Sequence, residues 1–229
     1  MRYHHGNLKS NLINCAYEWI ASNGIDNISL RKIAEIAEVS QTAPYRHFKS
    51  KEHLLAEVAT LGFEKLSFEI DKNITTDDAI DDLVRCSVTY IEFGLNNEHI
   101  IDLMFNYPIK KAEYPSLLES ADTAFALLLK RLKYLHDGKE GAAPLNSIST
   151  HAYVHGLLTI LQMHQRIDKS TKTEFFKASS AVKDNLDAIT CEIAAFNCVF
   201  KEAAVLAMIT SLVPPAFAMS LKLLIPEPD

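Results

Sequence analysis

The sequence is poor in the residues that mark linkers, disulfide-rich proteins and secreted proteins. Of its 229 residues, seven are glycine and eight are proline, too few for a low-complexity or linker-rich chain. The four cysteines include no CxxC pair, which favours free, buried thiols in a reducing compartment. The opening residues MRYHHGNLKS contain no apolar run of the kind that a secretory signal needs. These absences predict a soluble, cytoplasmic protein.

Signatures of common enzyme classes are also missing. The sequence has no GxSxG, P-loop or GxGxxG motif, and no carboxylate pair stands out from the solvated helix faces. His151 and His155 are four residues apart, a spacing at which two imidazoles on one helix can share a metal. However, HAYVH lacks the glutamate of an HExxH motif, and no third ligand is evident. We expect no enzymatic activity, no cofactor and no metal site.

One long uncharged run raises the question of a membrane span. Residues 203–221 carry no formal charge, and nineteen residues are enough to cross a bilayer. A double proline lies inside this run, and charged residues flank it closely. We expect residues 203–221 to lie in a buried helix, in particular one at a subunit interface, with no membrane contact; the role of the apolar segment 203–225 stays open.

The charge is distributed unevenly along the chain. Residues 1–54 contain seven Lys/Arg and five Asp/Glu, a net charge of +2, whereas the whole chain carries −6, so the remainder carries −8. Phosphates would be repelled by so acidic a remainder. Any contact with nucleic acid is therefore expected in the N-terminal quarter.

Apolar residues recur at helical spacing almost everywhere, and no strand-like alternation is sustained. The chain is therefore predicted to be all-α, with nine or ten helices. Capping residues, glycines and prolines give approximate boundaries. The expected helices cover about 12–23, 29–37, 40–48, 50–68, 75–93, 98–105, 115–136, 147–165 and 173–212.

The second and third of these helices are short and are joined by only Ala37-Glu38-Val39-Ser40, the arrangement of a helix-turn-helix. The polar residues after this turn suit DNA, because Gln41 can pair with adenine and Tyr45 can donate to phosphate. The same pattern also fits three amphipathic helices with a solvated face. The candidate DNA-binding residues are Ser29, Arg31, Ser40, Gln41, Thr42, Ala43, Tyr45, Arg46, His47 and Lys51.

Specific motifs in residues 8–58 resemble the DNA-binding domain of the TetR family of bacterial regulators. The segments ISLRKIAEIAEVS and PYRHFKSKEHLL carry this resemblance, including the Tyr, spacer, His, Phe, then Ser-Lys-Glu signature at residues 45–52. The opening YHHGNLK, the PYRHF variant and HAYVHGLLTIL resemble a subgroup with a so-called WHG domain. The resemblance implies an N-terminal helix-turn-helix domain, placed at residues 1–55, and a larger helical domain at 56–229 for ligand binding and dimerisation.

Two positions depart from the family pattern. Glu38 stands where the family usually has glycine in a left-handed turn; a positive φ there would strain a glutamate by about 1 kcal/mol or more. His151 stands where the subgroup often has tryptophan, so packing near that helix, or the pocket, is expected to differ.

The resemblance further implies a homodimer that binds a palindromic DNA operator, most simply as a repressor released by a small-molecule effector. Its interface would be a four-helix bundle from two C-terminal helices of each subunit. The alternative is a dimeric helical protein that binds a ligand or partner but recognises no operator. Candidate pocket residues are the aromatic and histidine residues of the middle helices: Tyr90, Phe93, Phe105, Tyr107, Phe125, His151 and His155.

Overall fold

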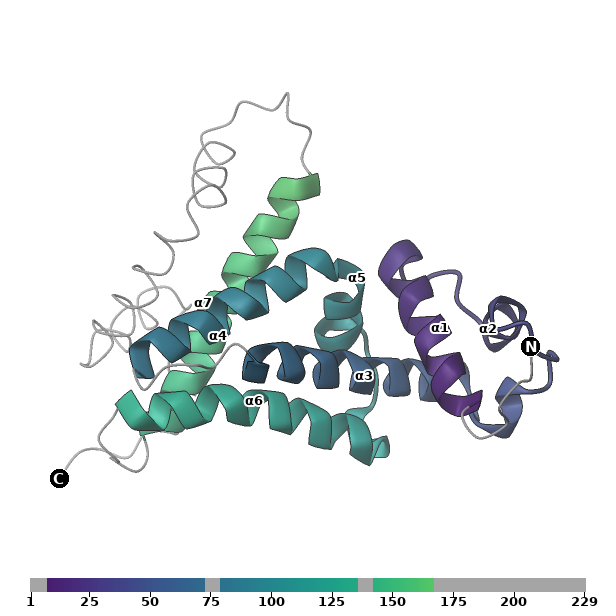
Figure 1. Ribbon diagram of the computed structural model, residues 1–229, viewed down its shortest axis with the longest axis horizontal. Helices are drawn as coiled ribbons and strands as arrows, with labels where there is room; N and C mark the ends of the chain where they lie inside the picture. Colours follow the sequence, from purple (N-terminus) through teal and green to yellow (C-terminus); the bar gives the residue numbers. More distant parts are fainter. Residues whose placement is uncertain (1–7, 73–78, 136–141, 167–229) are drawn as a thin grey trace, which may run out of the picture. The chain divides into compact units, whose positions relative to one another are not determined.

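A computed structural model describes residues 8–72, 79–135 and 142–166. Every regular element in these ranges is helical, which confirms the predicted all-α fold (Figure 1). The α-helices are α1 (Leu8–Asn23), α2 (Leu30–Ile36), α3 (Lys51–Lys72), α4 (Ala79–Asn96), α5 (Glu98–Ile101), α6 (Pro115–Leu135) and α7 (Ala142–Arg166). Three shorter turns of helix are η2 (Pro44–Arg46), η3 (Asp102–Asn106) and η4 (Lys111–Glu113).

The expected third helix is shorter and tighter than predicted. Between α2 and α3 the structure has a turn followed by a single 3-10 helical turn, η2, instead of a continuous helix over 40–48. Pro44 explains the difference, because it has no N–H to donate to the Ser40 carbonyl. The Ala43 N–H donates to the Ser40 carbonyl instead, at 2.9 Å. Phe48, fully buried, anchors the end of this segment in the core.

The turn after α2 has the geometry that favours glycine. Glu38 has a φ of 53° and is the only non-glycine residue with positive φ among those described. Its N–H donates to the Glu35 carbonyl at 3.1 Å, and the Val39 N–H donates to the Ala34 carbonyl at 3.0 Å. This pair of bonds is the Schellman arrangement that ends many helices, with Glu38 in the left-handed position. Glu38 therefore has the positive φ that strains a residue with a Cβ.

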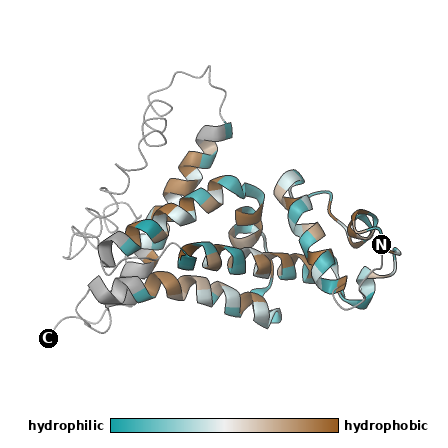
Figure 2. Cartoon of the chain, viewed as in Figure 1, coloured by the Kyte–Doolittle hydropathy of each residue, from teal (hydrophilic) through white to brown (hydrophobic). Residues whose placement is uncertain are grey.

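Helix α3 links the N-terminal helices to the middle of the chain. It packs against α1, α4 and α6, while α4 also packs against α6 and α7. Hydrophobic and hydrophilic residues alternate along the helices (Figure 2). At helical spacing this alternation places the two kinds on different faces of a helix, as the periodicity of the sequence predicts. α3 buries ten of its 22 residues along its length, so it packs against α1 as well as against the middle helices α4 and α6.

The helix predicted over 98–105 is present, as the short α5 followed directly by the wider π-helical turn η3. None of the helices in the described ranges is long and apolar enough to cross a membrane. The predicted helix 173–212, the apolar segment 203–225, the YHHGN opening and two of the four cysteines lie outside the described residues. Of the other two, Cys15 is partly buried and Cys86 is buried.

Candidate nucleic-acid interface and internal cavity

The segment after the α2 turn presents several polar side chains to solvent together. Gln41, Thr42 and Arg46 are exposed, and Tyr45 is 54% exposed although it is a large aromatic residue. The buried residues of the same segment hold its backbone in place, while these side chains remain available. An exposed ring and cation beside two hydrogen-bonding side chains can contact phosphates and base edges.

Ala43 does not share this exposure. It is 8% exposed, so its methyl group packs inside the domain, and we omit it from the proposed contact set. The Ser40 and Thr42 hydroxyls lie 3.2 Å apart and can hydrogen-bond to each other. This contact orients the Thr42 side chain. The Thr42 hydroxyl can still make a further hydrogen bond, because a hydroxyl has one donor and two acceptor positions.

Two of the other predicted residues have local structural partners. Ser29 caps α2, its hydroxyl accepting from the Lys32 N–H at 3.1 Å. The Lys51 ammonium donates to the Ile25 carbonyl at 3.3 Å and thereby ties the loop after α1 to α3. His47 is half-buried, whereas Arg31 is exposed. Arg46 is therefore a freer candidate for a phosphate contact than Lys51.

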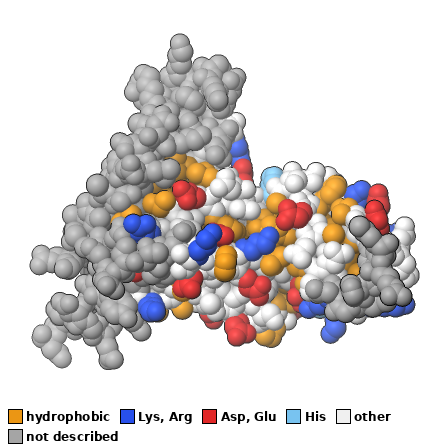
Figure 3. Space-filling model, in the orientation of Figure 1, with side chains coloured by type: hydrophobic (Ala, Val, Ile, Leu, Met, Phe, Trp, Pro, Cys, Tyr) orange, Lys and Arg blue, Asp and Glu red, His pale blue; other side chains and the backbone are white. Residues whose placement is uncertain are grey.

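On the face shown in Figure 3, cationic and anionic side chains are interspersed over the described residues.

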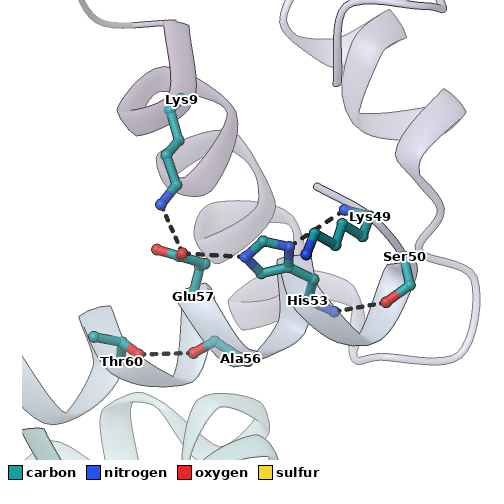
Figure 4. A network of polar contacts seen from close by, with 7 residues as sticks. All are labelled: Lys9, Lys49, Ser50, His53, Ala56, Glu57 and Thr60. Carbon is teal, nitrogen blue, oxygen red and sulfur yellow. Dashed lines mark hydrogen bonds and ion pairs between the residues drawn. The ribbon is translucent and has the colours of Figure 1, made fainter. Parts of the chain in front are cut away.

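A polar network joins the start of α3 to α1 (Figure 4). The Ser50 hydroxyl accepts from the His53 N–H at 3.1 Å, and the His53 ring accepts from the Lys49 N–H at 3.2 Å. Glu57 then contacts His53 at 3.4 Å and Lys9 at 2.6 Å. These contacts fix the first turn of α3, where the predicted DNA-binding segment ends.

The same first turn also contacts the segment before α6. The Glu52 carboxylate accepts from the Lys110 N–H at 3.3 Å. The His53 ring stacks on Tyr114, with centroids 5.8 Å apart and planes 28° apart. Sequence reasoning missed this junction, because nothing in the pattern relates positions 52–53 to positions 110–114.

A partly open cavity of about 140 Å³ lies between α3, α4, α6 and α7. Four of the seven predicted pocket residues line it: Tyr90, Phe105, Phe125 and His151. The other lining residues are Phe63, Leu66, Ile70, Cys86, Ser87, Lys111, Ala121, Ala124, Leu128, Thr150 and Val154. Phe63 and Lys111 were not predicted; Lys111 lies in an irregular segment where periodicity gives no signal.

The remaining predicted pocket residues lie elsewhere. His155 is not part of the lining, but its ring hydrogen-bonds to the Tyr90 hydroxyl at 2.7 Å. Phe93 is buried and borders a separate open groove beside α1. Tyr107 follows η3 and does not line the cavity.

The histidines near the cavity favour their neutral form. Burial, and then the proximity of His155, lower the pKa of His151. Burial also lowers the pKa of His155 and raises that of the Tyr90 phenol. The two imidazole rings stack with centroids 5.6 Å apart. Among the described residues, no group of three side chains suited to holding a metal is found.

Comparison with known proteins gives a family match for the N-terminal part of the chain. Residues 12–58 match the family model for bacterial regulatory proteins of the tetR family. Over 106 residues the chain is 26% identical to the HTH-type transcriptional regulator QacR of Staphylococcus aureus, spanning 46% of this chain and about half (52%) of that relative.

Solved structures share the fold over a longer stretch. A protein of unknown function from Rhodococcus sp. RHA1 is 23% identical, with a TM-score of 0.63, covering 81% of this chain and 96% of that one. The transcriptional regulator FadR of Bacillus subtilis, solved with stearoyl-CoA, is 18% identical, with a TM-score of 0.54, covering 77% and 96%. These likenesses extend the shared fold beyond the N-terminal segment.

Proposed function

The chain belongs to the TetR family of bacterial regulatory proteins through its N-terminal domain, and from that premise we propose that it is a ligand-responsive repressor. It binds a palindromic DNA operator as a homodimer in the cytoplasm and is released when a small molecule enters the cavity. The observation that carries this proposal is the joint exposure of Gln41, Thr42, Tyr45 and Arg46 directly after the α2 turn.

Recognition would divide into base reading and positioning. Gln41 is the residue suited to read a base edge, because its amide can pair with adenine through two hydrogen bonds. Thr42 can donate to a base or a phosphate, and Tyr45 and Arg46 suit phosphate oxygens. With Ala43 buried, hydrogen bonds rather than methyl contacts would supply the specificity.

Helix α3 is proposed to couple the cavity to the DNA-binding segment. In the first turn of α3, His53 contacts Phe48 and Ser50 at the end of that segment. In the middle of α3, Phe63 and Leu66 line the cavity. A ligand that fits only one position of α3 would shift the distance between the two DNA-binding segments of a dimer. Equal affinity for both positions would shift nothing.

A second copy has an apolar face available on α7. Ile148 is 61% exposed and Met163 is 48% exposed, and the small residues Ala152 and Gly156 between them are exposed as well. A stripe of this kind lets a partner helix approach closely. A two-fold dimer would present two DNA-binding segments about 34–36 Å apart, one turn of B-DNA.

The stearoyl-CoA bound by FadR is not carried over to this chain. A cavity of about 140 Å³ is small beside the roughly 300–1,000 Å³ of drug-sized ligand sites. The effector proposed here is correspondingly compact.

The proposal is tested by fluorescence anisotropy with labelled duplexes. Duplex DNA from the region upstream of the chain's own gene is compared with a shuffled duplex of equal composition, between about 50 and 200 mM salt. We expect tighter, salt-dependent binding to the upstream duplex. Equal affinity for both duplexes would instead support the alternative, a dimeric ligand- or partner-binding protein without operator recognition.

A further inference from the structure

The walls of the cavity are built from rings in contact with one another, most of them edge to face and one pair tilted. Phe105 lies 5.4 Å from Phe63, with planes 71° apart, and 5.6 Å from His151, with planes 36° apart. The Tyr90 ring is 5.7 Å from His151, and Phe125 is 6.5 Å from it. Rings at these separations prefer edge-to-face and offset contacts, which a further ring entering the cavity can continue.

The size of the cavity limits what this ring can be. About 140 Å³ is available, close to the roughly 150 Å³ of an apolar protein cavity that binds benzene. One six-membered ring fits such a space. Branched side chains such as Leu66, Ile70 and Val154 fill the rest of the wall.

Lys111 is the one Lys, Arg, Asp or Glu side chain among those that line the cavity, and burial lowers the pKa of the His151 imidazole. Its ammonium lies 5.8 Å from the centroid of the Phe63 ring. Within the described residues no carboxylate pairs with it, whereas the neighbouring Lys110 pairs with Glu113 at 3.4 Å. A cation beside apolar walls attracts an anionic group and repels a cationic one.

His151 supplies a second polar position. Its ring makes aromatic contacts, but in the part of the chain that the structure describes no hydrogen bond of its ring nitrogens is found. His155 and Tyr90, by contrast, satisfy each other. A neutral imidazole can donate one hydrogen bond to a ligand oxygen and accept one.

We infer that the cavity binds a single-ring aromatic acid, with its ring among Phe63, Phe105 and Phe125 and its carboxylate at the Lys111 ammonium. This inference rests on the proposed function and names the chemical class of its effector. Lys111 directly follows Lys110, whose N–H contacts Glu52 in the first turn of α3. A carboxylate that holds Lys111 in place therefore acts on the segment that contacts the DNA-binding end of α3.

The test uses the full chain, isothermal titration calorimetry and three probes. Phenylacetate is the acid, phenylacetamide is its neutral isostere, and octanoate is an acid without a ring. We expect phenylacetate to bind at least about tenfold more tightly than phenylacetamide, because hydrogen bonds to charged groups are the stronger ones. Octanoate is expected to bind more weakly than phenylacetate.

Two neighbouring lysines give a matched pair of variants. Lys111→Met should weaken phenylacetate binding about tenfold and leave phenylacetamide binding unchanged, whereas Lys110→Met should change neither. Thermal unfolding of both variants without ligand controls for folding. The inference is overturned if the amide binds as tightly as the acid, if Lys110→Met causes the same loss, or if octanoate binds best.

Binding of none of the three probes would also overturn it. If the anisotropy assay still shows selective DNA binding, the proposed function holds and only this class of effector is refuted. Conversely, Lys111-dependent binding of phenylacetate by a chain that does not select among duplexes would support the cavity assignment and refute the regulator.

Discussion

Replacement of Glu38 by glycine should make the protein more stable. Glu38 is exposed and has a φ of 53°, so its Cβ occupies a conformation that costs an L-residue about 1–2 kcal/mol. Glycine removes this cost, but it adds about 0.5–1 kcal/mol of backbone entropy to the unfolded chain. The net gain in the free energy of unfolding is about 1 kcal/mol or somewhat less.

The assay is urea unfolding and thermal unfolding of Glu38→Gly, Glu38→Ala and the unmodified chain, monitored by circular dichroism. A gain of this size corresponds to an increase of roughly 2–4 °C in Tm for a protein of this length. Glu38→Ala is the control, because alanine removes the carboxylate but keeps the Cβ. If glycine proves no more stable than alanine at this position, the reasoning from backbone strain is refuted.

Two further predictions concern the helices around the cavity. A Cβ added at Gly94 would lie 2.3 Å from a methyl carbon of the fully buried Leu158, whereas one added at Gly156 would have no neighbour within 4 Å. In urea unfolding at a protein concentration at which the chain is monomeric, Gly94→Ala should therefore lose about 1–3 kcal/mol by overpacking, while Gly156→Ala should gain up to about 1 kcal/mol from helix propensity; equal effects at the two sites would contradict this packing. The lowered pKa values of His151 and His155 mean that the unfolded chain binds protons more readily than the folded one, so their contribution to stability is fully present above about pH 6.5 and is lost as the pH falls below it. The decrease in Tm between about pH 7 and pH 5 should be smaller for the variant with both histidines replaced by glutamine, and an unchanged decrease would contradict the burial of these rings.

The sequence predicted the elements that depend on short-range pattern. The Ser29 cap, the buried Phe48 and the strained Glu38 turn follow from residues close together in the chain, and the structure has all three. The helix expected over 40–48 was wrong, although Pro44 was visible. In a helix starting at Ser40, Pro44 would lie in the first turn, where a missing N–H costs little. In the structure it begins η2 itself and prevents α-helical bonding back to Ser40.

The cavity shows the limit of pattern reasoning. Aromatic residues at helical spacing suggested Tyr90, Phe105 and Phe125, and these line it. The same spacing also suggested Phe93, which packs in the core beside another groove. Lys111 was missed, because its position is set by how the irregular segment before α6 folds back onto α3, and long-range packing of this kind leaves no periodic signal.

Selection of DNA sequences from a random duplex pool tests the central claim most directly, with the unmodified chain and Gln41→Ala examined in parallel. If Gln41 reads a base, the unmodified chain should enrich two inverted half-sites, and the variant should lose preference at one position in each half-site while keeping the rest. The expected loss of discrimination there is about 1–3 kcal/mol. Enrichment of the same sequence by both proteins, or of none by the unmodified chain, would contradict the account.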